Sequence, residues 1–314
     1  MKRNVHIIYC ALLILLCGIV TNNCDYYNDY GRGYRYDQGG NYFGSDPAFS
    51  PDGKQIVFGC IRYGLGDICT VNIDGTDLRR LTHTEAYEGE PKFSPDGNKI
   101  VFVSERENHA YGKIFIMNSD GTNQKQLTFG KGYDFNPDFS PDGGEIVFVR
   151  QIERYRRELF VIDINGSSLK MLTQDEKPKG RPYFSGGEKI RYKAYNYETQ
   201  RNEIYEITND RLYPTLILQL GKNEYDARYS KDGEKVVYIL QNLTDYATEI
   251  SIMSIDRKYV RQLTTSKTTK EHPTFSPDGR KIMFLSLEKD GRGKGQIMMM
   301  NADGSDLKTI ANNY

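Results

Sequence analysis

The sequence has no tryptophan, only 4 histidines and no net charge, because 42 Lys and Arg residues balance 42 Asp and Glu residues. A neutral chain has no overall field that draws it to nucleic acid, so we expect no nucleic-acid partner. The His-Glu-x-x-His, Cys-x-x-Cys and Gly-x-Ser-x-Gly patterns are also missing, and with them the usual signatures of zinc sites and α/β-hydrolases. The abundant residues are instead glycine (30) and tyrosine (24), a composition typical of all-β proteins with many turns.

Long apolar runs are scarce, and the one that stands out lies at the start of the chain. Residues 7–20 are almost entirely apolar and follow two basic residues. The run is too short for a membrane span of about 20 residues, whereas its length suits the core of an export signal. We therefore expect residues 1–24 to be a signal that is cleaved, lipidated at Cys17 or Cys24, or retained as an anchor. The protein would be periplasmic, outer-membrane-associated or secreted, and would meet a membrane only through this signal or lipid.

One segment recurs six times along the rest of the chain. It reads Pro-x-Phe-Ser-Pro-Asp-Gly at residues 47–53, and three further copies keep this form almost unchanged. Two degenerate copies, at residues 182–187 and 227–233, fill the remaining gap. The aromatic residue of the segment recurs every 44 to 46 residues, at Phe49, Phe93, Phe139, Phe184, Tyr229 and Phe275. This regularity predicts six copies of one structural unit.

Each unit is predicted to form a four-stranded antiparallel sheet. Ser-Pro-Asp-Gly is a tight turn between a first and a second strand, and a later Asp-Gly step predicts a hairpin from a third strand, such as 113–118, to a fourth, such as 125–128. Such a sheet has two apolar faces, which neighbouring units cover when they are stacked radially. A linear solenoid would need polar terminal units, but the first and last copies keep the intact motif. We therefore expect residues 46–312 to form an all-β, six-bladed β-propeller of four-stranded antiparallel blades.

The repeated Pro-x-Phe-Ser-Pro-Asp-Gly segment resembles the WD40-like repeat of the TolB family of β-propellers, over residues 47–312. The resemblance implies the propeller fold, but it says little about function, because this repeat also builds the propellers of peptidases and of other exported proteins. TolB itself carries an α/β domain before its propeller. Here only residues 25–45 separate the signal from the first blade, and this stretch, rich in Tyr and Gly, is predicted to be a tether.

The candidate binding site is a ring of polar residues, one from each unit. The residue just before each motif proline, or its equivalent, enters the innermost strand, which lines the central channel of a propeller. These residues are Asp46, Glu90, Asn136, Arg181, Asp226 and His272. Either they bind a ligand or ion at one mouth of the channel, or they are solvated loop ends. Asp46, Glu90 and Asn136 would suit Ca²⁺, whereas Arg181 argues against a purely cationic ligand. We expect no other cofactor and no other metal.

Cys60 and Cys69 are the two cysteines that lie beyond the signal region. Cys60 is predicted to follow the second strand of the first unit, and Cys69 to lie in the third. A hairpin centred between them pairs residues whose numbers sum to about 129, which sets the two cysteines directly opposite each other. They form either a disulfide, favoured by export, or two buried free thiols, because Cys also packs as a small apolar residue.

Three functions remain open from the sequence. We expect a non-catalytic module that binds an envelope protein or peptide at the channel mouth or on a rim. The alternative is a carbohydrate-active lyase or hydrolase that uses acids or His272 at the channel mouth. Such an enzyme needs a positioned base or a carboxylate pair, and the sequence offers only scattered polar residues. A purely structural extracellular module is the third interpretation.

Overall fold

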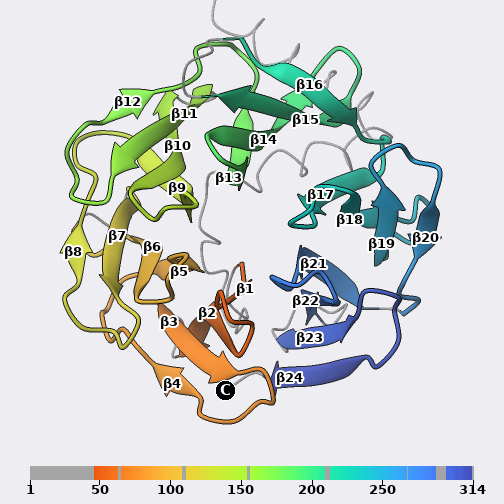
Figure 1. Cartoon of the computed structure of the whole chain (residues 1–314), viewed down its shortest axis with the longest axis horizontal. Coiled ribbons are helices and arrows are strands. Elements are labelled where there is room, and N and C mark those ends of the chain that lie inside the picture. The colour runs from red at the N-terminus through yellow and green to blue at the C-terminus, as the bar shows by residue number, and fades with distance from the viewer. Residues whose placement is uncertain are drawn as a thin grey trace, which may run out of the picture. The chain divides into compact units, whose positions relative to one another are not determined.

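The computed structural model describes residues 46–62, 65–107, 111–153, 156–208, 213–266, 268–287 and 295–312. Within these residues all regular structure is β-strand, arranged as six sheets of four strands each. The sheets stand around a common axis as the blades of a propeller (Figure 1), which confirms the predicted fold. The predicted signal, 1–24, and tether, 25–45, lie outside the described residues, in which no helix is long and apolar enough to cross a membrane.

Each blade consists of four consecutive antiparallel strands, numbered from the axis outward. Blade 1 contains β1 (Ala48–Phe49), β2 (Gln55–Arg62), β3 (Leu65–Asn72) and β4 (Arg79–Arg80); blade 2 contains β5 (Glu88–Phe93), β6 (Lys99–Ser104), β7 (Lys113–Asn118) and β8 (Lys125–Gln126); blade 3 contains β9 (Tyr133–Phe139), β10 (Glu145–Glu153), β11 (Arg156–Asp163) and β12 (Lys170–Met171); blade 4 contains β13 (Lys179–Gly186), β14 (Lys189–Asn196), β15 (Arg201–Thr208) and β16 (Thr215–Gln219); blade 5 contains β17 (Glu224–Tyr229), β18 (Lys235–Gln241), β19 (Thr248–Ser254) and β20 (Val260–Gln262); blade 6 contains β21 (Thr269–Phe275), β22 (Lys281–Leu287), β23 (Gly295–Asn301) and β24 (Lys308–Asn312).

The repeated Ser-Pro-Asp-Gly segment forms the turn between the first and second strands. In blade 1 the Ser50 hydroxyl donates to Asp52 Oδ1 at 2.6 Å and accepts from the Gln55 amide at 2.9 Å. Gly53 has a φ of +69°, a conformation that a side chain would strain. The turn is therefore specified by its own residues, which explains why the sequence predicted it correctly.

The Asp-Gly turn between the third and fourth strands has a second role, in contact between blades. A Cβ added to Gly75 would lie 2.8 Å from the carbonyl oxygen of Ile310 in the neighbouring blade, and one added to Gly121 would lie 2.9 Å from that of Leu81. Both distances are shorter than any side chain tolerates. Glycine is thus needed here for close approach of two backbones as well as for the turn.

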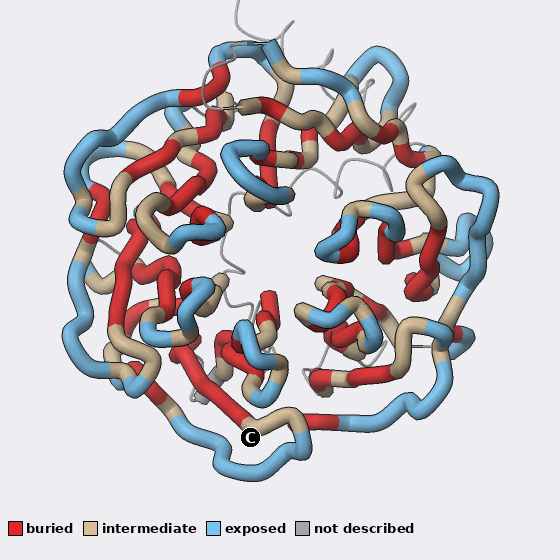
Figure 2. Tube along the Cα trace, viewed as in Figure 1, coloured by how far each residue is buried: buried red, intermediate tan, exposed pale blue. Residues whose placement is uncertain are grey.

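The apolar core lies between adjacent blades. Ile56 and Phe58 of blade 1 pack in one buried cluster with Met283 and Met299 of blade 6. The ring is therefore closed by side-chain packing, since all four strands of blade 1 are consecutive in the chain. Figure 2 shows buried residues along the middle strands of the blades and a largely exposed outer perimeter.

Cys60 and Cys69 are joined by a disulfide, but the predicted pairing of their strands is wrong. Cys69 lies opposite Phe58, and Cys60 lies opposite Asp67. Paired residue numbers sum to 127 rather than 129, because the hairpin of β2 and β3 is centred one position earlier in the chain than predicted, with Arg62 opposite Leu65. A slip of two residues keeps both side chains on one face, and the two Cα atoms lie 5.8 Å apart as diagonal neighbours.

We expect the Cys60–Cys69 disulfide to be present in the isolated protein. Proteolysis without reduction should yield one peptide pair cross-linked through these residues, as measured by mass spectrometry. Replacing both by serine should lower the free energy of unfolding by about 2–3 kcal/mol, because the bond closes a loop of roughly ten residues. Recovery of both cysteines as alkylated free thiols after denaturation without reductant would contradict the bond.

Candidate functional site

All six residues of the predicted ring share one unusual backbone conformation. Each has a φ between 49° and 55°, although none is glycine. In blades 2 to 6 the ring residue is the third or fourth residue of its innermost strand, where the pairing register with the second strand shifts. Asp46 lies just before β1. Five of the ring residues therefore occupy bulges within the innermost strands rather than loop ends, and Asp46 has the same backbone conformation just before its strand.

Such bulges are costly, and they change the direction of a side chain. A non-glycine residue in the left-handed region is destabilising by about 1–3 kcal/mol, and a following proline normally favours an extended conformation instead. Glu90, Asn136, Arg181 and His272 all precede a proline. Because bulges re-aim side chains, their recurrence at one position in five blades points to a role for the residues that they redirect.

The ring residues connect one blade to the next. Glu90 accepts hydrogen bonds from the backbone and the side-chain amide of Asn136. Asn136 Oδ1 in turn accepts from the Arg181 amide at 3.0 Å, and Asp226 Oδ2 accepts from the His272 amide at 3.0 Å. The bulge exposes the amide of one blade at the axis, and the ring side chain of the preceding blade accepts its hydrogen bond.

Arg181 is the centre of the ring. Its Nη1 lies 2.9 Å from both Asp46 Oδ1 and Asp226 Oδ1, and its Nη2 lies 2.6 Å from His272 Nδ1. Arg181 belongs to blade 4 and Asp46 to blade 1, which are opposite blades of a six-membered ring, so this contact crosses the axis. The ring residues thus meet one another in the middle of the propeller.

The charges of the ring shift its pKa values in opposite directions. Burial opposes ionisation of Asp46 and Asp226, but the Arg181 charge, together with His272 and Arg228, outweighs it and holds the pKa of both carboxyls below the usual range. For His272, burial is outweighed by Asp46 and Asp226, which raise its pKa. Burial and the Asp46 charge raise the pKa of Glu90 to about 7. The ring therefore holds ionised aspartates beside a glutamate that is protonated at mildly acidic pH.

The solvated-loop interpretation does not describe these side chains. Asp46, Arg181 and Asp226 are only 7%, 7% and 4% exposed, and they pair with one another. The Arg181 guanidinium also occupies the space between two carboxylates that a cation would use. Among the described residues, no group of three or more His, Cys, Asp or Glu side chains is arranged to hold a metal ion.

A second set of axial residues was missed by the sequence analysis. It occupies the variable position x of the Pro-x-Phe motif, two residues after each ring residue and one step closer to the Ser-Pro-Asp-Gly turn. Each member pairs with the middle residue of the apolar triplet in the second strand. We call this set the second tier: Ala48, Lys92, Asp138, Tyr183, Arg228 and Thr274. The sequence signal that could have found this set is the variation of residue x among the six repeats. A position that differs among otherwise similar repeats is free to serve a specific role.

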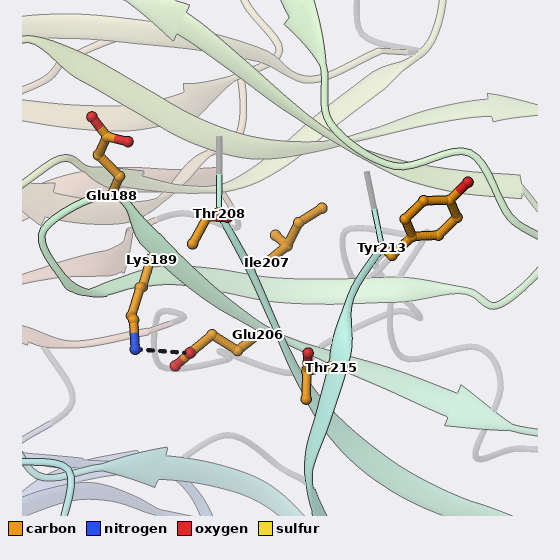
Figure 3. Close-up of a pocket in the computed structure, with 7 residues that line it drawn as sticks. All are labelled: Glu188, Lys189, Glu206, Ile207, Thr208, Tyr213 and Thr215. Atoms are coloured by element: carbon orange, nitrogen blue, oxygen red, sulfur yellow. Dashed lines mark ion pairs between the residues drawn. The ribbon is translucent and has the colours of Figure 1, made fainter. Parts of the chain in front are cut away.

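One cavity lies away from the ring. It has a volume of about 410 Å³ and is lined by residues of blade 4. Figure 3 shows the ion pair between Lys189 and Glu206, with Nζ and Oε1 3.2 Å apart, and the side chain of Tyr213, which is 86% exposed. The lining residues come from β14 to β16 and their turns rather than from the innermost strand β13, so this cavity is separate from the axial residues.

Comparisons with known proteins agree with the fold. The sequence matches the family model described as the TolB beta propeller domain over residues 38–182 and 151–313. No curated protein matches it. Solved structures with the same architecture include TolB from Acinetobacter baumannii, with 19% identity and a TM-score of 0.67, over 80% of this chain and 62% of that protein. This chain therefore matches less than two thirds of the Acinetobacter protein.

Two further solved structures have the same architecture. A protein provisionally assigned as TolB from Agrobacterium tumefaciens has 19% identity and a TM-score of 0.64, over 77% of this chain and 87% of that one. Oligogalacturonate lyase from Vibrio parahaemolyticus has 14% identity and a TM-score of 0.56, over 79% and 87%. At these identities the likeness shows the fold alone.

Replacing Arg181 by methionine should destabilise the propeller strongly. Removal of the guanidinium leaves two buried carboxylates without their cation, which costs about 3–5 kcal/mol in free energy of unfolding. Urea unfolding measures the loss. The control is Arg257→Met, which removes an arginine paired with Glu224 at the surface and should cost at most about 1 kcal/mol. Adding Asp46→Asn and Asp226→Asn to Arg181→Met should recover part of the stability. Equal stability of the two single variants would contradict the central role of Arg181.

Replacing Glu90 by glutamine should change how stability depends on pH. The raised pKa of Glu90, about 7 in the folded protein, means that folding favours the protonated acid. This contribution is complete below the unfolded pKa and is lost as pH rises through 7. Glutamine stays neutral, so Glu90→Gln should match the unmodified protein at pH 5 and exceed its stability by about 1–3 kcal/mol at pH 8. If the stabilities of Glu90→Gln and the unmodified protein change in parallel from pH 5 to 8, the raised pKa of Glu90 is refuted.

Proposed function

The chain belongs to the TolB β-propeller family, and on that basis we propose that it is an exported, non-catalytic propeller that binds a protein or peptide of the cell envelope. The binding site in this proposal is the axial space between the innermost strands, on the side of the Ser-Pro-Asp-Gly turns. The export signal predicted at residues 1–24 supports the location, and the arrangement of the axial residues supports the site.

The observation that carries the proposal is the pair of axial layers. The ring crosses the axis through the contact between Arg181 and Asp46, so it forms a polar floor. The second tier lies one step closer to the Ser-Pro-Asp-Gly turns and differs from blade to blade. Ala48 and Tyr183 pack in the apolar clusters between blades, and the other four members are polar. A floor of mutually paired charges beneath a variable layer is suited to recognition of one partner, because the floor fixes the shape and the upper layer supplies the specific contacts.

A carbohydrate-active enzyme is the second candidate, and one observation favours it. Burial raises the pKa of Glu90 to about 7 and that of Asp138 to about 6, values that suit a general acid or base near neutral pH. However, Glu90 accepts two hydrogen bonds from Asn136, and such contacts fix it as part of the ring. The purely structural module remains as the outcome in which neither binding nor turnover is found.

Blocking the axial space should abolish partner binding. Thr274→Tyr places a bulky side chain in the second tier, whereas Thr309→Tyr makes the same exchange at an exposed position of β24. The full-length protein and both variants would be used to recover partners from detergent extracts of the envelope, with cytosolic extract as background. We expect Thr274→Tyr to lower recovery of an envelope protein at least tenfold and Thr309→Tyr to leave it unchanged.

Two further arms separate the alternatives. A comparison of partner recovery with added Ca²⁺ and with a chelator tests whether Ca²⁺ contributes to binding. Turnover of acidic polysaccharides, followed by the absorbance of an unsaturated product, tests the enzyme. If the unmodified protein turns over a polysaccharide and Glu90→Gln does not, the catalytic function is supported and the binding function is rejected. Equal recovery by all three proteins would show that the axial space is not the binding site.

A further inference from the structure

Lys92 and Arg228 are the two cations of the second tier. They belong to blades 2 and 5, which are opposite each other across the axis. Lys92 pairs with Val101 and Arg228 with Val237, so both lie at the same height in their blades. Both are partly exposed, and the Arg228 side chain is 19% accessible. A molecule that enters along the axis would therefore meet both side chains.

Lys92 has no local partner in the part of the chain that the structure describes. It forms no hydrogen bond or ion pair there, and the charges that act on it come from blades 1, 3, 4 and 5. Only a position near the axis is within electrostatic range of four other blades. Burial lowers the pKa of Lys92, the Asp46 charge opposes this shift, and the Arg228 charge adds to it. Arg228 has one carboxylate nearby, Asp226, at 3.9 Å.

The fully buried lysines among the described residues are all paired. Lys179 lies 3.0 Å from Glu158, Lys270 lies 3.1 Å from Glu249, and Lys113 lies 3.6 Å from Asp134, as measured between Nζ and the carboxylate oxygens. Removing a charge from water without pairing it is unfavourable. Lys92 differs from these lysines because it is partly exposed and has no carboxylate oxygen within ion-pair distance among the described residues. Its ammonium group is therefore accessible to the carboxylate of a ligand.

We propose that Lys92 and Arg228 form a carboxylate-binding subsite, which takes an Asp or Glu side chain of an extended acidic peptide. This inference rests on the proposed function, because it specifies the chemistry of the bound partner. Two cations on opposite sides can each donate to one oxygen of a carboxylate. Asp138, in the neighbouring blade, accepts from the Phe184 amide at 3.3 Å and bounds the subsite with a negative charge.

A peptide is favoured over a sugar by the backbone that surrounds the subsite. Among the strands that the structure describes, each innermost strand is an edge strand of its sheet, as Figure 1 shows. Edge strands present N–H and C=O groups that match those of an extended peptide. The axial space therefore offers amide partners along its wall and cations at the second tier, which together fit an acidic peptide.

The test uses a fluorescein-labelled hexaglutamate peptide and the full-length protein at low ionic strength, with fluorescence anisotropy as the readout. We expect binding that weakens as salt is added, and hexaglutamine should bind at least tenfold more weakly. Lys92→Met and Arg228→Met should each weaken hexaglutamate binding about tenfold or more, because each removes a charge-assisted hydrogen bond. Asp138→Asn should strengthen binding severalfold, because it removes a repulsive charge and keeps an oxygen for the Phe184 amide.

Lys54→Met is the matched control, since it removes a lysine whose side chain is 80% exposed on the first turn of blade 1. It should leave affinity unchanged. Lys92→Met should also melt at the same temperature as the unmodified protein or higher, because Lys92 forms no ion pair among the described residues that the exchange would break. That result separates a binding role from a structural one.

Each other outcome overturns a stated part of the inference. Equal affinity for hexaglutamate and hexaglutamine, or no effect of Lys92→Met, would refute the subsite. Binding of an oligogalacturonate that hexaglutamate does not displace would refute the peptide assignment. If hexaglutamate binds at the subsite but no envelope protein is recovered from extracts, the subsite is supported and the proposed function is rejected.

Discussion

Contact between blades is the constraint on which this structure depends. A four-stranded sheet with two apolar faces cannot be stable alone in water, so each blade needs a neighbour on both sides. Among the described residues, the last and first blades meet through packed side chains, with Ile56 and Phe58 against Met283 and Met299, and no strand is shared between them. The stability of the ring therefore depends on the quality of every interface. The glycines of the outer turns follow from the same constraint, because Gly75 lets one blade approach the backbone of the next.

The polar ring at the axis acts on the same interfaces from inside. Apolar packing is non-directional, whereas the hydrogen bond from the Arg181 amide to Asn136, and that from the His272 amide to Asp226, fix how one blade is placed against the next. Arg181 then joins blade 4 to blades 1, 5 and 6 at a single point. Six residues are held in the left-handed conformation to bring these side chains together, so the ring contributes the alignment that the apolar layers lack.

Division of the axis into two layers connects stability with function. The ring residues are buried and paired with one another, which suits a structural floor. The second tier differs from blade to blade and retains a lysine that the fold does not pair. Residues of both kinds are charged, so charge alone does not distinguish them. The difference lies in whether the protein itself supplies the partner, and Lys92 is the residue for which it does not.

The sequence by itself determined the number of blades, their strands and the position of the ring. A motif that recurs every 44 to 46 residues fixes these features, because turns such as Ser50 to Gly53 are specified by their own side chains. Only the tertiary structure decided which ring residues meet, since Asp46 and Arg181 are far apart in the chain and come together across the axis. It also corrected the register at Cys60 and Cys69, which depends on where the hairpin between their two strands is centred. The left-handed conformation of the ring residues was not predictable either, because a residue before proline favours an extended backbone unless its neighbours in space hold it otherwise.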